Sequence, residues 1–241
     1  MNTPDATPIP PSRKVHPMSS APWPVAAAPL HTARTPLRPV VPGICAPPVE
    51  RRAPLWAQPI APAPGMGTPN PHWWWLGAHG GAGVSTLTGL AALSADSHRA
   101  WPSGDPSQSP NVVLVCRTHL EGLERARDLL RQHTVGGLLP PVLQVLGLVT
   151  VPDAPGKAPP TVRRAMKLVG AAAPRVWHLP WIEDWRSAQL HEMPTWHPTA
   201  PAPTRTNRTQ EVSVPPEHRS CFTALYELVQ TPLRAPRRTP G

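Results

Sequence analysis

The stretch WWWLGAHGGAGVSTLTGLAAL, Trp73–Leu93, decides the fold that this sequence predicts. It starts with an apolar aromatic run, continues through a glycine-rich turn and ends in leucines and alanines at helical spacing. We therefore expect a strand over 73–76, a turn over 77–84 and a helix over 85–95. The turn after the first strand of a parallel sheet is the usual place for a phosphate group, because glycine amides can approach its oxygens closely.

The residues after this stretch repeat the alternation of strand and helix. The β-branched run at 111–118 predicts a strand buried on both faces, and Thr118 and Glu121 are spaced as a capping box at the start of a helix. This order is typical of an open parallel sheet. We predict an α/β fold with a small, mostly parallel sheet of four to five strands and flanking helices. The other expected elements are helices at 118–133 and 161–173, strands at 141–151 and 175–182, and a loop at 96–110.

Proline separates this core from the rest of the chain. The sequence has 39 prolines, many of them before Trp73, and proline at this density blocks both helices and strand pairing. An amphipathic helix near the C-terminus either docks on the core or serves as a recognition helix for another protein. The expected divisions are a disordered Pro/Arg-rich arm at 1–71, the α/β core at 72–190, a Pro-rich linker at 191–216, the helix at 217–230 and a disordered basic tail at 231–241.

The net charge of +9 comes almost wholly from arginine. Many arginines lie in the segments that we expect to be disordered, and such tails attract polyanions without reading sequence. Nucleic acid is therefore one candidate partner, reached through the basic tails. A GC-rich genome would also produce this composition, which has much Ala, Pro and Arg and little Lys.

The cysteines and the hydropathy predict a cytoplasmic protein. Cys45, Cys116 and Cys221 are widely separated and have no metal-binding or disulfide spacing, which suits a reducing compartment. The sequence has no apolar run that approaches 18 residues and no charged segment followed by a signal-like apolar one, so we expect no membrane span.

The glycine-rich turn has the glycines of a phosphate loop without its lysines. It resembles the deviant loop of the partition and cell-division ATPases, the ParA/MinD class, whose pattern is KGGxGK[ST]T. His79 stands at the signature lysine of that class and Val84 at the general phosphate lysine. The chain is also similar to pilus-localisation and septum-site relatives, and to small uncharacterised actinobacterial proteins with this loop. The positions that match are Gly80, Gly81, Ala82, Gly83, Ser85 and Thr86.

The resemblance implies that ATP with Mg²⁺ binds at 79–86, with Ser85 reaching the metal ion. Backbone amides can bind phosphate without any lysine, whereas phosphoryl transfer needs cationic stabilisation. His79 is a weak substitute, and Lys157 could supply a cation from the turn at 151–160. Neither Asp96 nor Asp105 follows an apolar strand, so neither is expected to bind the metal as a Walker B aspartate.

These features favour a non-catalytic, weakly nucleotide-binding protein that acts as an interaction or regulatory module through an unknown protein partner. One alternative is an active ParA-like ATPase that uses His79, Lys157 or a residue of a partner. Another is a polyanion-binding protein that acts through its basic tails. Three tryptophans at four-residue spacing either pack in the core or form an aromatic partner site; they are Trp177, Trp181 and Trp185.

Overall fold

The computed structural model describes residues 44–60, 70–200 and 213–231. The remainder of the predicted arm, linker and basic tail lies outside the described residues. Secondary structure begins with a short 3₁₀ helix, η1, at Val49–Arg51 and ends with the helix α4 at Pro216–Gln230.

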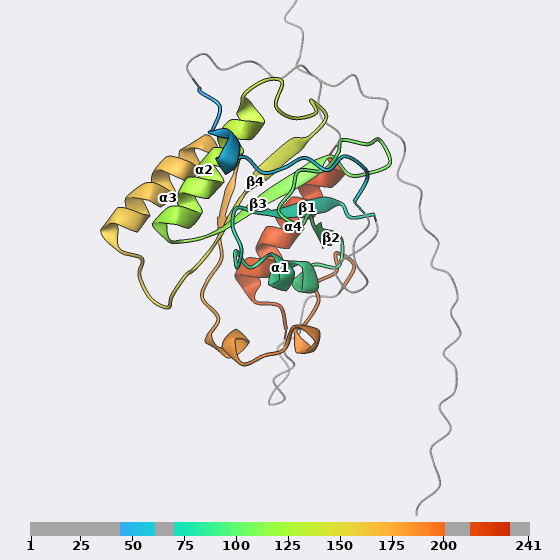
Figure 1. Ribbon diagram of the computed structural model, residues 1–241. Helices are drawn as coiled ribbons and strands as arrows, with labels where there is room; N and C mark the ends of the chain where they lie inside the picture. The colour runs from blue at the N-terminus through green and yellow to red at the C-terminus, as the bar shows by residue number, and fades with distance from the viewer. Residues whose placement is uncertain (1–43, 61–69, 201–212, 232–241) are drawn as a thin grey trace, which may run out of the picture. The chain divides into compact units, whose positions relative to one another are not determined.

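The described chain builds one open sheet of five parallel strands in the order β2-β1-β3-β4-β5 (Figure 1). This topology confirms the α/β class and the parallel sheet that the sequence predicts. Residues 111–117 form a central strand because their β-branched side chains are buried on both faces. The strands are β1 at Trp73–Gly77, β2 at Ser94–Asp96, β3 at Asn111–Arg117, β4 at Gln144–Val151 and β5 at Val176–His178.

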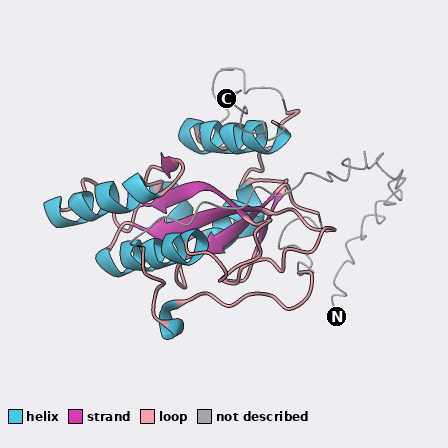
Figure 2. Ribbon diagram, turned by 90° about the horizontal axis from the view of Figure 1, so that it is seen from above, coloured by secondary structure: helices cyan, strands magenta, loops and turns pink. Residues whose placement is uncertain are grey.

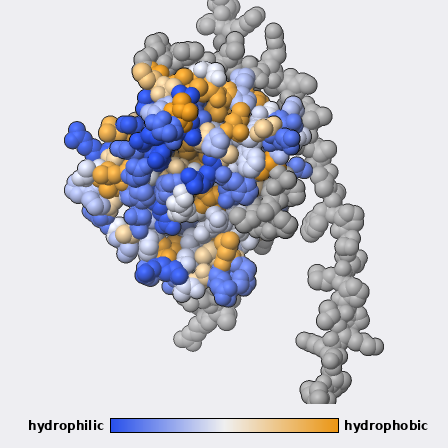
Figure 3. Space-filling view, in the orientation of Figure 1, coloured by the Kyte–Doolittle hydropathy of each residue, from blue (hydrophilic) through white to orange (hydrophobic). Residues whose placement is uncertain are grey.

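Helices cover both faces of this sheet (Figure 2). On one face, α1 at Val84–Leu90 and α4 pack on β1 and β3, and on the other face α2 at Leu120–Thr134 and α3 at Pro160–Ala172 pack on β3 and β4. The outer surface of α2 carries charged residues, and Figure 3 shows a largely hydrophilic surface on that side of the view. Of the helices in the described ranges, none is long and apolar enough to cross a membrane. Short 3₁₀ helices follow β5 at Glu183–Arg186, η2, and at Leu190–Glu192, η3.

The three consecutive tryptophans of β1 divide between the two faces of the sheet. Trp73 and Trp75 join the cluster under α1 and α4, and Trp74 lies on the opposite face. All three are fully buried. The indole Nε1 of Trp75 donates to Ser94 Oγ at 2.7 Å, and that of Trp74 donates to the Ser109 carbonyl at 3.1 Å. The aromatic run is therefore the centre of the core, as a buried strand requires.

The region after α1 differs from the prediction. The helix ends at Leu90 instead of continuing to residue 95, and residues 94–96 form the edge strand β2. Trp196, from the predicted linker, donates its amide to the Leu90 carbonyl at 2.7 Å and accepts from the Ala92 amide at 3.1 Å. These distant contacts replace the hydrogen bonds that would have extended the helix.

The predicted capping box at Thr118 and Glu121 is wrong. The N-cap of α2 is His119, whose Nδ1 accepts from the Gly122 amide at 3.0 Å. The Thr118 hydroxyl instead accepts from the amide of Asp153, at 3.1 Å, in the turn after β4. Thr118 therefore joins two loops at the edge of the sheet.

Residues 44–60, which we call the N-terminal strap, correct the prediction that the disordered arm extends to residue 71. Arg51 forms an ion pair with Asp128, a buried residue of α2. The backbone of Ala53 exchanges two hydrogen bonds, of 2.8 and 2.9 Å, with the side chain of Gln132. Trp56 and Ile60 cover Trp74, on a part of the sheet that α2 and α3 do not reach. The strap is held because apolar surface of β1 would otherwise face water.

The C-terminal part of the chain also belongs to the core. Trp196 and Val214, both within the predicted linker, are buried under the same face of the sheet. The helix expected over 217–230 spans Pro216–Gln230 and buries Cys221, Phe222 and Leu225 against β1. Of the two roles that the sequence left open for this helix, the structure shows docking on the core.

Candidate functional site

The carboxyl edge of the sheet holds the glycine-rich turn. The chain runs from β1 outward to β2 and then returns past β1 to β3, so the strand order reverses between β1 and β3. In open α/β sheets, ligands bind at such a switch point beyond the carboxyl ends of the strands. Residues 78–83, which we call the glycine loop, leave β1 at this point.

The glycine loop has backbone amides without hydrogen-bond acceptors among the described residues. Gly81 and Gly83 adopt positive φ angles of 77° and 100°, which residues with a side chain rarely adopt. Within the described ranges, the amides of residues 80–85 donate no hydrogen bond, and Gly80 and Gly81 are exposed to solvent. Free amides of this kind can bind an anion without any side chain.

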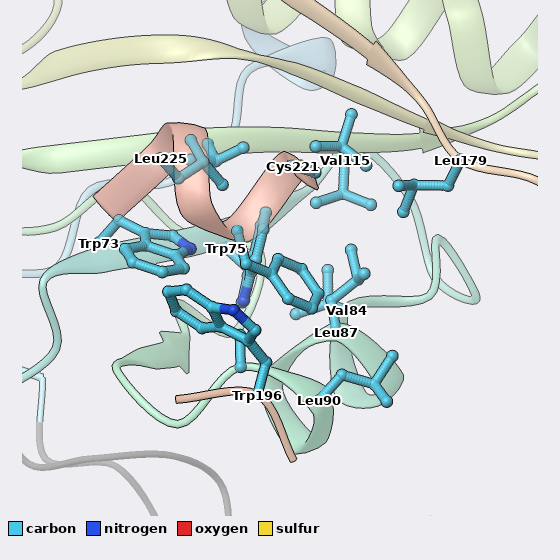
Figure 4. Packing of buried hydrophobic residues seen from close by; sticks show 14 of the residues in the cluster. Trp73, Trp75, Val84, Leu87, Leu90, Val115, Leu179, Trp196, Cys221 and Leu225 are labelled. Carbon is cyan, nitrogen blue, oxygen red and sulfur yellow. The ribbon is translucent and has the colours of Figure 1, made fainter. Parts of the chain in front are cut away.

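Val84 is a core residue. It stands where a phosphate loop has its lysine, yet its side chain is only 8% exposed and packs in the cluster with Leu87 (Figure 4). Its Cγ2 atom lies 3.0 Å from the position that a Cβ would take on Gly77. A lysine here would place its ammonium group in an apolar cluster, so the packing explains why the sequence has valine.

His79 fixes the glycine loop to the end of β3. Its Nε2 lies 3.1 Å from the amide nitrogen of Arg117, and its Nδ1 lies 2.8 Å from the carbonyl oxygen of Gly80. An amide can only donate, so Nε2 accepts and the ring proton is on Nδ1, which donates to Gly80. His79 is therefore an anchor of the loop and does not replace the missing lysine.

Two arginines that the sequence analysis did not select lie at the loop. The guanidinium of Arg117 donates from Nε to the Gly81 carbonyl at 3.1 Å and from Nη1 to the Pro152 carbonyl at 2.6 Å. Nη1 of Arg99 lies 4.0 Å from the position that a Cβ would take on Gly80. His98 and Arg99 both have positive φ angles, 54° and 60°, and such backbone often marks functional sites.

The other predicted site residues are spread along the edge. Ala82 is buried, Ser85 is exposed and Thr86 is half-buried at the start of α1. Lys157 is exposed in the turn after β4 and makes no hydrogen bond or ion pair with any described residue. The structure thus brings residues 79–86 together without showing a contact between them and Lys157.

The two aspartates considered for metal binding have local partners. Asp96 is the last residue of the short strand β2, whose sequence Ser-Ala-Asp is not an apolar run, and its Oδ1 accepts from the His98 amide at 2.7 Å. Asp105 accepts from the amide and the hydroxyl of Ser107, and these bonds hold its pKa below the usual value. The described ranges contain no group of three or more His, Cys, Asp or Glu side chains that could hold a metal ion.

A pocket of about 190 Å³ opens beside the glycine loop. It lies between the first turn of α1, the ends of β3 and β4, the segment after β5 and the start of α4. Its lining contains two arginines and two tryptophans and no Asp or Glu. The lining residues are Gly83, Thr86, Leu87, Arg117, Val151, Pro152, Leu179, Pro180, Trp181, Ile182, Trp185, Arg186, Met193 and His218.

His218 is the most unusual residue of this pocket. It is 2% exposed, and its Nδ1 has no hydrogen-bond partner in the described part of the chain. Burial lowers its pKa to about 4, although the nearby charge of Glu217 acts in the opposite direction. Its ring contacts Trp185 and Phe222 at centroid distances of 4.7 and 6.4 Å. The pocket therefore contains a neutral imidazole with an unused polar atom.

A comparison with protein-family models matched residues 72–197 to a family of unknown function, DUF6668. The chain belongs to this family. The match covers more than half of the 241 residues and includes the whole sheet and the glycine loop, whereas the N-terminal strap and α4 lie outside it. Searches of the curated proteins and of the solved structures gave no match.

In this DUF6668 domain, the sequence held a usable signal for only one of the two arginines that lie at the glycine loop. Arg117 lies near the end of the strand predicted at 111–118 and just before a predicted helix, which is where parallel sheets place ligand-binding side chains. Arg99 and His218 carried no such signal. Arg99 reaches the loop through an irregular turn, and His218 reaches the pocket because α4 docks more than a hundred residues after the loop.

The buried His218 predicts that the domain loses stability as the pH falls from about 7 to 5. The pKa is lower in the folded protein, about 4, than the usual 6.5, so the unfolded chain binds more protons in this range. The contribution of the neutral imidazole to the free energy of unfolding is fully present above pH 6.5 and is lost progressively as the pH falls toward 4. Urea unfolding at pH 7 and pH 5 measures the loss. In His218→Phe the loss should be smaller, and equal losses in both proteins would contradict the prediction.

Proposed function

We propose that this domain binds the phosphate groups of a nucleotide weakly at the glycine loop, without hydrolysing it. It then acts as an interaction or regulatory module for a protein partner. The observation that carries this proposal is the set of unpaired amides at residues 80–85, at the switch point of the sheet and beside Arg99. Amides and guanidinium groups together are a common means of binding phosphate.

The same geometry argues against phosphoryl transfer. Transfer needs a cation beside the charge that develops on the phosphoryl group, and the residue at the lysine position is buried in the core. Both ring nitrogens of His79 are occupied by backbone partners, so the alternative of an ATPase that uses His79 has no free ring donor to support it. For an ATPase that uses Lys157, the described residues show no hydrogen bond or ion pair of Lys157 in its favour. Arg99 and Arg117 supply charge for binding, and the exposed Ser85 supplies a hydroxyl for Mg²⁺ bound to ATP.

The proposal also includes a protein partner, which would sense the bound nucleotide. The module would respond to the nucleotide through the loops at the carboxyl edge, since the glycine loop contacts the ends of both β3 and β4 through Arg117. Binding of polyanions through the basic arms is the second alternative from the sequence, and it concerns mainly segments outside the described residues.

Calorimetric titration of the full chain with ATP–Mg tests the binding. Arg99→Gln should weaken binding about tenfold, because a charge-assisted hydrogen bond to phosphate contributes about 1.5–3 kcal/mol. The matched control is Arg164→Gln, which removes an exposed arginine of α3, on the sheet face opposite α1. No heat of binding up to about 5 mM ATP, a concentration above the millimolar range of weak sites, would refute the proposal.

A phosphate-release assay tests the absence of hydrolysis. The wild-type protein should release no phosphate from ATP–Mg above the level of a sample without protein. Steady release that disappears in Ser85→Ala would instead establish the ATPase alternative.

A further inference from the structure

The pocket beside the glycine loop has the size of a small ring system. An engineered apolar cavity of about 150 Å³ binds benzene, whereas sites for drug-sized ligands occupy about 300–1,000 Å³. The volume here, about 190 Å³, lies just above the first figure. Of the glycine loop only Gly83 lines the pocket, so its occupant is distinct from a phosphate group on the exposed glycines.

The walls of the pocket are mainly apolar and aromatic. Trp181 and Trp185 come from the segment after β5, Leu87 from α1 and Met193 from the residues after η3. Trp181 is held by a hydrogen bond from its Nε1 to Glu183 at 2.6 Å, and Trp185 is held by its contact with the His218 ring. Fixed indole rings favour a planar aromatic ligand, because stacked or edge-on rings gain energy beyond simple burial.

The charge of the pocket is positive. Its lining includes Arg117 and Arg186 and no carboxylate. Arg186 is paired with Glu183, whereas Arg117 bonds only to backbone carbonyls and forms no ion pair with the described residues. Two of the five donors of Arg117 are used, so the others remain for a ligand. An uncompensated guanidinium beside apolar walls selects an anion, and its planar fork matches a carboxylate.

The unpaired nitrogen of His218 adds a specific polar contact. A buried polar atom without a partner costs about 1–3 kcal/mol, and nearly all such atoms in folded proteins are paired with protein or water. His218 lines the pocket, so a ligand that hydrogen-bonds to its imidazole would remove this cost. Only a ligand with a polar group on or beside its ring gains this contribution.

We propose that this pocket binds a one- or two-ring aromatic carboxylate. The ring lies among Trp181, Trp185 and Leu87, the carboxylate is bound by Arg117, and a polar atom of the ring hydrogen-bonds to His218. This pocket shares Arg117 with the proposed phosphate site, but its tryptophans and His218 belong to the pocket alone, and Arg99 belongs to the glycine loop alone.

The test is calorimetric titration of the full chain with nicotinate and indole-3-carboxylate, each compared with its neutral carboxamide. At least one carboxylate should bind with one-to-one stoichiometry and about tenfold more tightly than its amide. Arg117→Gln should reduce this ratio toward one, a change that partial unfolding cannot mimic. His218→Phe keeps a ring against Trp185. It should lower the affinity for the carboxylate at least fivefold and leave the affinity for ATP–Mg unchanged. Circular dichroism confirms that each variant is folded.

Three results would overturn the proposal. The first is the absence of binding by both carboxylates up to about 10 mM, well above weak small-molecule affinities. The second is equal affinity for carboxylate and amide in the wild-type protein. The third is unchanged affinity in folded His218→Phe. Arg99→Gln separates the two sites, since it should lower ATP–Mg affinity and leave carboxylate binding intact. If one ligand failed to bind the wild-type protein, binding of the other could still be measured and tested.

Discussion

Trp75→Ala is expected to lower the free energy of unfolding by about 3–5 kcal/mol, the usual cost of removing a buried aromatic side chain. Trp75 is fully buried in β1, where its ring contacts Trp73 and Phe222 and its Nε1 donates to Ser94 Oγ. The substitution leaves a cavity between β1 and α4 and removes the hydrogen bond that the Ser94 hydroxyl accepts, while its own bond to the Ala91 carbonyl remains. Domains of this size are stable by about 5–15 kcal/mol, so the loss is a large part of the total.

Urea unfolding followed by far-ultraviolet circular dichroism measures this loss. Trp75→Phe should cost less than the alanine variant, since it keeps most of the ring and removes the bond to Ser94. Trp181→Ala is the matched control, because Trp181 is only partly buried and belongs to none of the core clusters. If Trp75→Ala cost no more than Trp181→Ala, the tryptophan run would not be the centre of the core.

Phe222→Ala in α4 is expected to destabilise the protein by a similar amount, about 3–5 kcal/mol. The Phe222 ring is fully buried and lies against Trp75 and Trp196, with centroids 6.1 and 5.9 Å apart. These contacts join β1, α4 and the residues after η3, which are far apart in the sequence. Removing the ring therefore weakens the attachment of α4 as well as the packing of the strand.

The neighbouring Thr223 supplies the control for this variant. Its side chain is exposed on the other side of α4, so Thr223→Ala should change stability by about 0.5 kcal/mol or less. Both variants are compared by chemical unfolding, and hydrogen exchange in α4 reports its local attachment. Fast exchange in α4 of Phe222→Ala with slow exchange in the sheet would show that the helix detaches first. Equal stability of the two variants would contradict docking of α4 as a part of the core.

The predicted elements that proved correct all had a local signal. The β-branched run at 111–117 and the periodic leucines of α2 specify strand and helix through contacts that repeat along the chain itself. The elements that were missed had no such pattern. β2 is three residues long and forms because Trp75 and Trp196 provide its surroundings, and the strap is held by Asp128 and Gln132 of α2.

In the candidate site too, some features of the glycine loop could be predicted from local sequence and others could not. Its location after β1 and its unpaired amides follow from the glycines and the strand–turn–helix order, so the sequence placed residues 79–86 correctly at the edge of the sheet. The orientation of the side chains did not follow. Val84 faces the core and His79 bonds to the backbone at Arg117, and neither fact can be read from a spacing of residues.

The sequence by itself determined the alternation of strands and helices, the parallel sheet and the position of the glycine loop, because these depend on near neighbours in the chain. Only the tertiary structure decided which cations reach the loop, that α4 closes one face and that His218 is buried beside the pocket. Those features depend on contacts between segments tens to more than a hundred residues apart. Many of these contacts cover apolar surface of the sheet, and segments without helical or strand periodicity, such as the N-terminal strap, provide part of that cover.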